Sequence, residues 1–285
     1  MSVTILADKQ NRDGGWPYAR GGSWTEPTAY AVLALFAAGE KEPAERGVRW
    51  LQAVRRPDGG WPPQPGIDQS TWVTALVALL PPEHLGQSVH AGAIRWLMGM
   101  AGAESAATYR LREWLLGHAP LAGEDPPGWP WVPGTAAWVA PTGLAILALE
   151  AEYRRNPRPD LKLRIGAGRQ FLLHRVCQGG GWNHGSTHAL GYPSTPYPEV
   201  TGLALAALRG VRSPQVETSI ALARSYLTQC RSADAWNWLR LGLLVHGQLP
   251  AESEASSGLS RRTLPETALD LMVTASIQRR DGFLV

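Results

Sequence analysis

The sequence predicts an all-α protein in which helical hairpins repeat along the chain. Three observations lead to this prediction: a loop phrase ending in Gly-Gly-Trp recurs, a nearly all-apolar segment follows each copy, and an amphipathic segment precedes it. The first two copies are about 45 residues apart, a period typical of repeat architectures. Such hairpins bury their apolar faces by stacking side by side or by closing into a ring.

The loop phrase occurs four times, and in its third and loosest copy a single glycine precedes the tryptophan. The copies lie at residues 10–16, 55–61, 126–131 and 178–182, and their tryptophans are Trp16, Trp61, Trp129 and Trp182. Adjacent glycines allow a tight turn that other residues resist. The tryptophan behind them can pack against the next repeat, so we interpret these loops as structural and not as catalytic.

Each loop is followed by a segment that is apolar on nearly every side, at residues 27–35, 71–79, 141–149 and 200–208. A helix with no polar face is buried all round, so these segments are predicted to form inner helices. Residues 46–55, before the second loop, instead place apolar residues at helical spacing between arginines. That pattern indicates an outer helix with one buried face.

Proline, glycine and the apolar periodicity set the expected order of elements. Inner helices are predicted at about 24–38, 70–80, 139–153 and 200–208, and a further one contains residues 236–239. Outer helices are predicted at about 43–56, 87–118 with an extra segment, 161–177 and 214–230. A polar loop at 251–258 precedes a last helix from Pro265, and residues 278–283 echo the loop phrase, as expected where a ring closes. We therefore expect one domain over residues 1–285 with essentially no sheet.

Composition and charge exclude several classes of protein. Of the 285 residues 44% are hydrophobic, 13 are tryptophan and only 3 are phenylalanine, so tryptophan has a specific use in the repeat loops or in an aromatic cavity. The net charge of +3 comes from basic residues scattered along the chain. Without a basic stripe interleaved with aromatics, nucleic acid is not an expected partner.

The chain begins without a charged region followed by an apolar run, and the first repeat has already begun at Gln10. We therefore expect no signal peptide, no transmembrane helix, at most peripheral membrane contact, and a cytoplasmic location. Two cysteines, Cys177 and Cys230, are too few for a disulfide framework and are interpreted as buried thiols.

The outer helix and its loop resemble the QW motif of the squalene–hopene cyclase and terpene cyclase superfamily. Residues 5–6 with Gln10, Gly14 and Trp16 match the motif from its aliphatic position onward. Residues 46–47, 50–51, Gly59 and Trp61 match with Arg55 at the glutamine position, and residues 171–172, Gly180 and Trp182 match with Val176 there. The resemblance covers nearly the whole chain and implies the α/α-toroid that these cyclases share with protein prenyltransferases.

The resemblance also indicates where an acid would lie. Class II cyclases of this superfamily carry Asp-x-Asp-Asp before an inner helix, and its middle aspartate protonates the isoprenoid. This chain lacks the motif, but Glu199 and Glu26 occupy the middle position before their inner helices, with Glu199 ranked first. The alternative is that both simply stabilise the positive end of a helix. Neither the aspartate-rich motif of class I cyclases nor the zinc set of protein prenyltransferases has a counterpart.

Aromatic and histidine side chains are the candidate substrate-binding groups. Trp24, Trp72 and Trp138 are expected at the entrances of inner helices, where they could stabilise a carbocation or merely plug the ring. The loop between the fourth tryptophan and its inner helix is enlarged and contributes His184, His188, Tyr192 and Tyr197, and Tyr30 follows Glu26 on the first inner helix. The two histidines have no third ligand in sight, so no metal or other cofactor is expected.

Two functions follow from this sequence. The first is an enzyme that cyclises or isomerises an isoprenoid, or another apolar small molecule, by proton donation from a buried carboxylic acid. The second is a catalytically silent toroid that binds a lipid or a protein partner. The absent aspartate cluster favours the second function more than the fold suggests, but the terpenoid-cyclase-like enzyme is the leading hypothesis.

Overall fold

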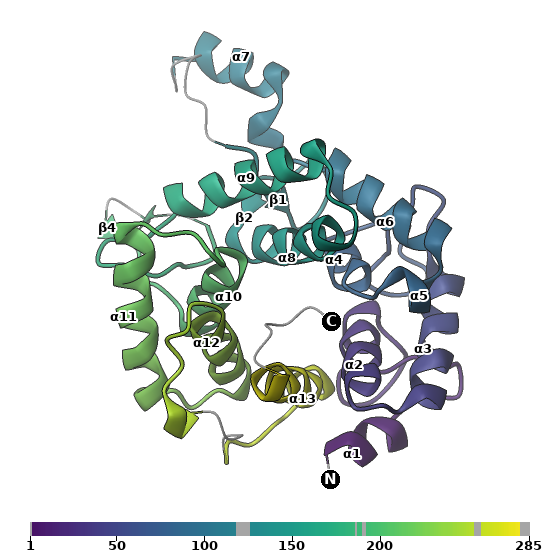
Figure 1. The fold of residues 1–285 in the computed structure, drawn as a ribbon. Helices are drawn as coiled ribbons and strands as arrows, with labels where there is room; N and C mark the ends of the chain where they lie inside the picture. Colours follow the sequence, from purple (N-terminus) through teal and green to yellow (C-terminus); the bar gives the residue numbers. More distant parts are fainter. Residues whose placement is uncertain (1, 118–125, 186, 190–191, 254–257, 280–285) are drawn as a thin grey trace.

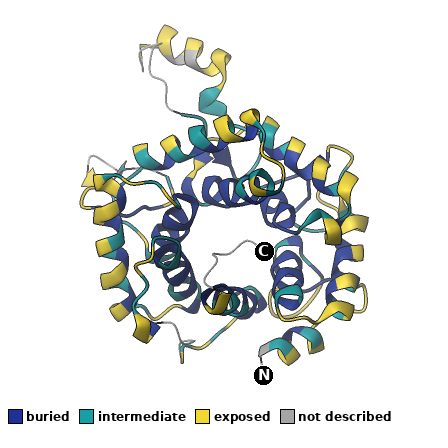
Figure 2. Ribbon diagram, viewed as in Figure 1, coloured by how far each residue is buried: buried dark blue, intermediate teal, exposed yellow. Residues whose placement is uncertain are grey.

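The computed structural model describes residues 2–117, 126–185, 187–189, 192–253 and 258–279. Its helices form two concentric rings, an inner ring that is almost wholly buried and an outer ring whose outward faces are exposed (Figures 1 and 2). The predicted α/α-toroid is therefore confirmed. None of the helices in the described residues is long and apolar enough to cross a membrane.

The inner ring consists of six helices in which each packs against the next. These are α2 (Thr25–Ala37), α4 (Val73–Ala78), α8 (Val139–Arg155), α10 (Pro198–Ala207), α12 (Ala233–Val245) and α13 (Leu264–Arg279). Because α13 packs against α2, the ring is closed. The apolar runs of the sequence thus form inner helices as predicted, although α4 is shorter than expected.

The outer ring consists of α1 (Ser2–Asp8), α3 (Lys41–Val54), α5 (Pro82–Leu85), α6 (Gln87–Gly99), α9 (Pro159–His174) and α11 (Pro214–Gln229). The 3₁₀ turns η1 (Ala103–Ser105) and η2 (Ala251–Ser253) lie in connections. The predicted extra segment is α7 (Ala107–Leu115), which projects away from the ring (Figure 1). The sequence did not predict the single turn α5, because Pro81 and Pro82 were interpreted only as the end of the second inner helix.

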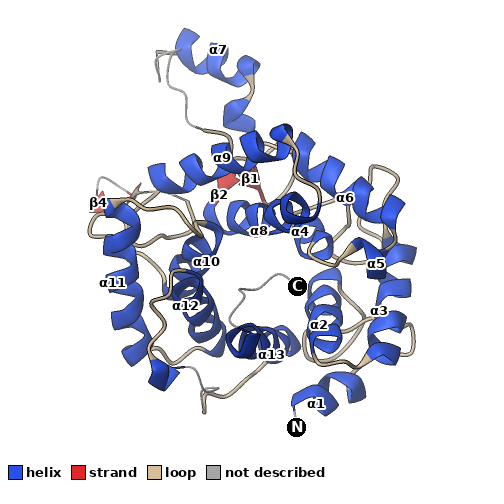
Figure 3. Ribbon diagram, in the orientation of Figure 1, coloured by secondary structure: helices blue, strands red, loops and turns tan. Residues whose placement is uncertain are grey.

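Within the described residues, the strands form two very short antiparallel pairs (Figure 3). They join β1 (Trp129–Pro130) to β2 (Ala137–Trp138), and β3 (His188–Ala189) to β4 (Tyr192–Pro193). The prediction of essentially no sheet is therefore confirmed. Cys177 is a buried free thiol as predicted, whereas the free thiol of Cys230 is only half-buried.

The four loop tryptophans make the same contacts in every repeat. Each backbone N–H donates to the hydroxyl of a threonine on the following inner helix, over 2.8–3.0 Å, and each indole N–H donates to a leucine carbonyl of an outer helix, over 2.7–2.9 Å. Their indoles are at most 2% exposed. The loops therefore lock an outer helix to an inner one, which is the structural role predicted for them.

The threonine contacts correct the predicted alignment of the second repeat. The sequence alignment placed Trp72 opposite Thr28, but Trp61 donates to Thr74 and not to residue 72. The inner helix of the second repeat is therefore shifted by two residues. Trp72 consequently occupies the repeat position that Glu26 occupies in the first repeat.

Hydrogen bonds between neighbouring repeats fix the first turns of the inner helices. In three repeats, the backbone N–H at the start of an inner helix donates to the carbonyl two residues after the tryptophan of the next loop. The hydrogen bonds run from Thr25 to Pro63, from Trp72 to Trp131 and from Val139 to His184, at 2.9–3.0 Å. The Leu264 N–H donates to the Tyr18 carbonyl in the same way, at 2.9 Å. The last inner helix is thus joined to the first loop, as the predicted ring closure requires, although residues 280–283 of the terminal echo lie outside the described residues.

Gly59 shows how tightly these loops fit their neighbours. Its φ is +92°, and a Cβ placed there would lie 2.8 Å from the Gly92 carbonyl oxygen of α6. Gly39, at the end of α2, has φ +81° with no atom within 4 Å of such a Cβ. We expect Gly39→Ala to lower the free energy of unfolding by about 1–2 kcal/mol, the cost of a left-handed backbone, and Gly59→Ala by roughly 1–3 kcal/mol more. Urea unfolding of both variants checks this, and equal losses would contradict the close packing.

Candidate functional site

Three acidic residues occupy equivalent positions at the beginning of inner helices. Glu26, Glu199 and Asp234 are each the second residue of their helix, in α2, α10 and α12, and Glu266 is the third residue of α13. These four helices are consecutive around the ring. Four of the six inner helices thus carry a carboxylate at the N-terminal end, whereas the equivalent residues of α4 and α8 are uncharged.

Close packing of two helices brings Glu199 and Asp234 toward each other. A Cβ on Gly202, three residues after Glu199, would lie 2.3 Å from the backbone carbonyl carbon of Trp238, which is four residues after Asp234. The backbones of α10 and α12 therefore touch one turn below the two acids. Only glycine allows this approach, because any side chain would separate the helices.

Asp234 has the environment of a proton donor. Burial, followed by the charges of Glu199, Glu266 and Glu26, raises the pKa of its carboxyl group to about 7. A hydrogen bond with the Trp238 side chain opposes this rise and is the smallest effect. Because the side chain is half-buried and beside like charges, its neutral form persists near neutral pH.

Glu26 is paired with a tyrosine from the first loop. The Tyr18 hydroxyl donates a hydrogen bond to Glu26 Oε2. Burial raises the pKa of Glu26, partly offset by this hydrogen bond, and burial and the Glu26 charge raise the pKa of Tyr18. Tyr30, one turn below on α2, is buried, and its pKa is raised first by burial and then by Glu26 and Asp234. Glu26, Tyr30 and Asp234 therefore lie within electrostatic reach of one another.

The predicted aromatic residues form three separate groups. Trp24 packs against Tyr18, with ring centroids 5.5 Å apart, and so lies beside Glu26. Trp72 meets Trp131 edge to face at 4.9 Å. The third group contains Trp138, His184 and Tyr197, with His184 at 6.4 Å from Trp138 and 5.2 Å from Tyr197. The first group lies beside Glu26, and Tyr197 of the third group precedes Glu199 at the start of α10.

The remaining two predicted residues lie in the enlarged fourth loop. His188 pairs with Pro193 and Tyr192 with Ala189 in the short ladder of β3 and β4, and the side chain of Tyr192 is 75% exposed. The roles predicted for these two residues, and for Glu199 and Glu26 as acids, stay predictions. In the described part of the chain no group of three histidine, cysteine or acidic side chains is arranged to hold a metal ion.

Asp234 is the residue that sequence reasoning missed. Its repeat has no Gly-Gly-Trp phrase and no threonine two residues later, so alignment to the cyclase motif passes over it. The available signal was the cap: Ser232 accepts a hydrogen bond from the Ala235 N–H and marks the start of α12. Counting from that cap puts Asp234 at the position of Glu26 and Glu199.

A cleft of about 600 Å³ opens beside this group of acids. It lies where α10, α11, α12 and the segment before α13 meet, and its lining includes Glu199, Cys230, Arg231, Arg262 and Glu266. Asp234 is not part of the lining, although both of its neighbours are. The half-buried side chain of Asp234 therefore lies next to this cleft without being part of its wall.

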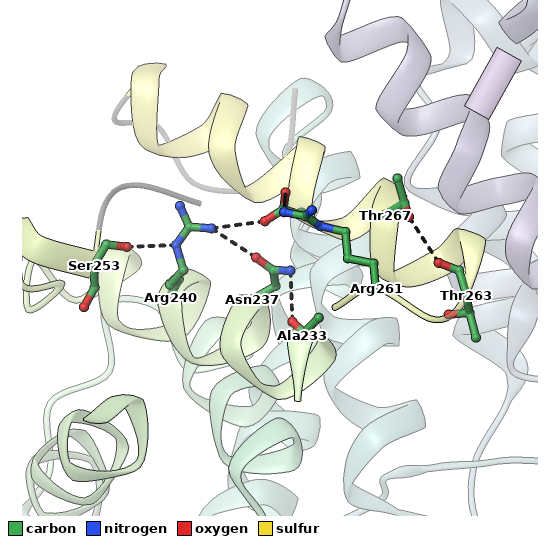
Figure 4. Close-up of polar contacts among 8 residues, drawn as sticks. Ala233, Asn237, Arg240, Ser253, Arg261, Thr263 and Thr267 are labelled. Atoms are coloured by element: carbon green, nitrogen blue, oxygen red, sulfur yellow. Dashed lines mark hydrogen bonds and ion pairs between the residues drawn. The ribbon is translucent and has the colours of Figure 1, made fainter. Parts of the chain in front are cut away.

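A buried polar network holds α12 against α13 below Asp234 (Figure 4). Arg240 is fully buried, and it donates to the Ser253 carbonyl at 2.9 Å and to Asn237 at 3.1 Å. Its guanidinium group lies 3.6 Å from Asp270, which also accepts from Arg261 at 2.7 Å. A buried charge is tolerated only when it is paired in this manner. The network therefore fixes the register of the two helices that carry Asp234 and Glu266.

Comparison with known proteins relates short segments of the chain to two enzymes. No family model matches. A segment of 66 residues, 22% of the chain, is 39% identical to the MMP endo-(1,4)-3-O-methyl-α-D-mannosidase of Mycolicibacterium hassiacum. A segment of 44 residues, 15% of the chain, is 50% identical to the squalene–hopene cyclase of Alicyclobacillus acidocaldarius. These matches span only 18% and 7% of the two relatives.

Solved structures with the same fold include a terpene cyclase and a mannanase. The type II terpene cyclase MstE from Scytonema superposes with a TM-score of 0.58 and 18% identity, over 90% of this chain and 74% of the cyclase. An inactive variant of the α-1,6-mannanase GH76A of Salegentibacter, in complex with α-1,6-mannotriose, superposes with a TM-score of 0.65 and 9% identity, over 98% of both chains. These similarities show that the chain has the α/α-toroid common to terpene cyclases and glycosidases.

Proposed function

We propose that this protein cyclises or isomerises an isoprenoid and that Asp234 donates the initiating proton. The observation that supports this most is the carboxyl group of Asp234, whose pKa of about 7 keeps a proton available near neutral pH. An ordinary aspartate is almost fully ionised there and cannot protonate an alkene. Burial among the inner helices supplies the desolvation that the reaction requires.

The step conserves atoms and charge. The Asp234 carboxyl O–H bond breaks, its proton forms a C–H bond with one alkene carbon, and the other alkene carbon becomes a carbocation. An intramolecular alkene then attacks the cation, and the last cation loses a proton from carbon to solvent water, which leaves a new C=C bond and ends the reaction. The carboxylate of Asp234 is left beside Glu26 and Glu199, so repulsion between like charges favours its reprotonation.

Aromatic side chains near Asp234 suit a cationic intermediate. Trp238 hydrogen-bonds Asp234, and Tyr30 lies within electrostatic reach of it. The faces of aromatic rings attract a nearby cation by about 0.5–2 kcal/mol each. Trp24, beside Tyr18 and Glu26, is the predicted substrate-binding residue that these contacts support best.

Glycoside hydrolysis is the second candidate, and the same group of acids favours it. Glycosidases use one protonated and one ionised carboxyl group, and Asp234 with Glu199 or Glu26 would supply such a pair. The mannosidase segment and the mannanase fold agree with this alternative. We rank it second because the tryptophan loops resemble the cyclase motif along nearly the whole chain.

The test is to incubate the protein with squalene, oxidosqualene, linear prenyl diphosphates and α-mannooligosaccharides, and to identify products by mass spectrometry. We expect a cyclic or isomerised isoprenoid from the wild type. Asp234→Asn should reduce its rate about 10²- to 10⁴-fold, the usual contribution of a general acid. The wild-type rate should fall as the pH rises through about 7, where Asp234 loses its proton.

The matched control is Glu217→Gln, which removes an exposed first-turn acid of the outer helix α11 and should keep the full rate. Turnover that survives in Asp234→Asn but is lost in Glu199→Gln would return the role of acid to Glu199. Release of mannose units would establish the glycosidase. No turnover of any substrate would favour the silent toroid.

A further inference from the structure

The projecting helix α7 carries an unusual concentration of exposed apolar side chains. Every described side chain of this helix is exposed, and α7 stands outside both rings (Figure 2). Four large apolar residues of this region are about half-exposed or more: Leu111 at 48%, Trp114 at 50%, Leu115 at 69% and Leu116 at 51%. Single exposed apolar residues are normal, but a contiguous group marks an interaction surface.

Three of these residues share one face of the helix. Leu111, Trp114 and Leu115 are spaced i, i+3 and i+4, which places their side chains side by side. The helix sequence also contains two arginines and one glutamate, so it is amphipathic with a small excess of positive charge. A short amphipathic helix with leucine and tryptophan on one side and arginine beside them is typical of segments that lie in a membrane interface.

The 3₁₀ turn η1, which precedes α7, is hydrogen-bonded to the segment that precedes the inner helix α8. The Ala103 N–H of η1 donates to the Thr135 carbonyl at 2.9 Å, and the Glu104 carboxylate accepts from the Ala137 N–H at 3.0 Å. Trp138 follows Ala137 and is 39% exposed, and it belongs to the aromatic group that also contains His184 and Tyr197. Exposed aromatic residues at the α8 and α10 entrances are therefore connected to α7 by a fixed segment.

The size of the surface distinguishes a lipid from a protein occupant. A large apolar side chain exposes roughly 150–250 Å² when fully free, so the half-exposed side chains of α7 offer on the order of 400 Å². A stable protein interface needs about 800 Å² on each partner. We propose that α7 docks this protein on an anionic lipid surface, with Leu111, Trp114 and Leu115 inserted between the lipids and Arg112 at the headgroups.

The experiment is flotation of the full chain with vesicles of phosphatidylcholine alone or with phosphatidylglycerol added. We expect the wild type to float with both and to bind the anionic vesicles more tightly, with a preference that weakens in high salt. Trp114→Glu and Leu115→Glu should each lower the partition coefficient about tenfold or more, because burying one such side chain is worth at least the ~1.4 kcal/mol that corresponds to a factor of ten.

Leu163→Glu is the matched control, since Leu163 is a solitary leucine that is 75% exposed on the outer helix α9. It should float like the wild type, and all variants should keep the wild-type melting temperature because α7 has no buried side chain among those described. Equal flotation of the α7 variants, or no flotation of the wild type, would overturn the proposal. A dimer in light scattering that the α7 variants dissociate would assign the surface to a second copy. Docking of α7 does not require that Asp234 act as an acid.

Discussion

Replacing Asp234 by asparagine should stabilise the protein by about 2–4 kcal/mol at pH 8 and have little effect near pH 4. The pKa of this carboxyl group is about 7 in the folded state against 3.8 in its ordinary state. Between these values the folded protein holds a proton that the unfolded chain has released. Stability therefore falls as the pH rises from about 4 to 7, and the full cost of the buried charge is present above pH 7. Asparagine cannot ionise, so the variant avoids that cost.

The measurement is denaturant unfolding of wild type and Asp234→Asn at several pH values, with Glu217→Gln as the exposed control. The control should be neutral at every pH. Asp234→Asn could also lose stability through its hydrogen bond with Trp238, but that loss would be the same at each pH. A stability difference that does not change between pH 4 and 8 would show that Asp234 has an ordinary pKa, and it would remove the main support for the proposed acid.

Trp61→Ala is expected to lower the free energy of unfolding by about 3–5 kcal/mol, the range for deleting a large buried aromatic side chain. The indole is fully buried and donates to the Leu51 carbonyl at 2.7 Å, so the variant leaves both a cavity and an unpaired carbonyl. For a chain of this size the melting temperature should fall by roughly 10 °C. Calorimetry or circular dichroism at 222 nm checks the prediction.

Trp114→Ala provides the control for the tryptophan itself, because Trp114 is 50% exposed on α7. It should change the melting temperature by no more than about 1–2 °C, as surface substitutions do. If Trp61→Ala melted like the wild type and instead abolished binding of a substrate, the loop would be functional and its structural interpretation would be wrong.

The fold could be predicted because its determinants are local and repeated. Each Gly-Gly-Trp phrase specifies a turn, a buried indole and a partner threonine within 12 to 19 residues. The alignment failed in the second repeat because two threonines, Thr71 and Thr74, precede and follow Trp72 there. Only the contact between Trp61 and Thr74 shows which of them is equivalent to Thr28.

The candidate site was less predictable, because it depends on distances between repeats. Glu26 and Glu199 could be found from the sequence, since each is followed within two residues by a threonine. The raised pKa of Asp234 comes from burial and from three carboxylates on other helices. These carboxylates are distant from Asp234 in the sequence, and the fold brings them near it. A motif search detects neighbours along the chain, whereas a raised pKa depends on neighbours in space.

The hydrogen bond from Leu264 to the Tyr18 carbonyl gives the molecule a property that an open solenoid lacks. In an array with two ends, a unit can be added or removed and the remaining interfaces stay as they were. Here the last inner helix must meet the first loop, so the rotation between successive hairpins has to sum to one full turn. The number of units is thereby fixed as a whole number by geometry. Added length is therefore accommodated without an extra hairpin, in the long connection between Trp182 and Thr201 and in the separate projecting helix α7.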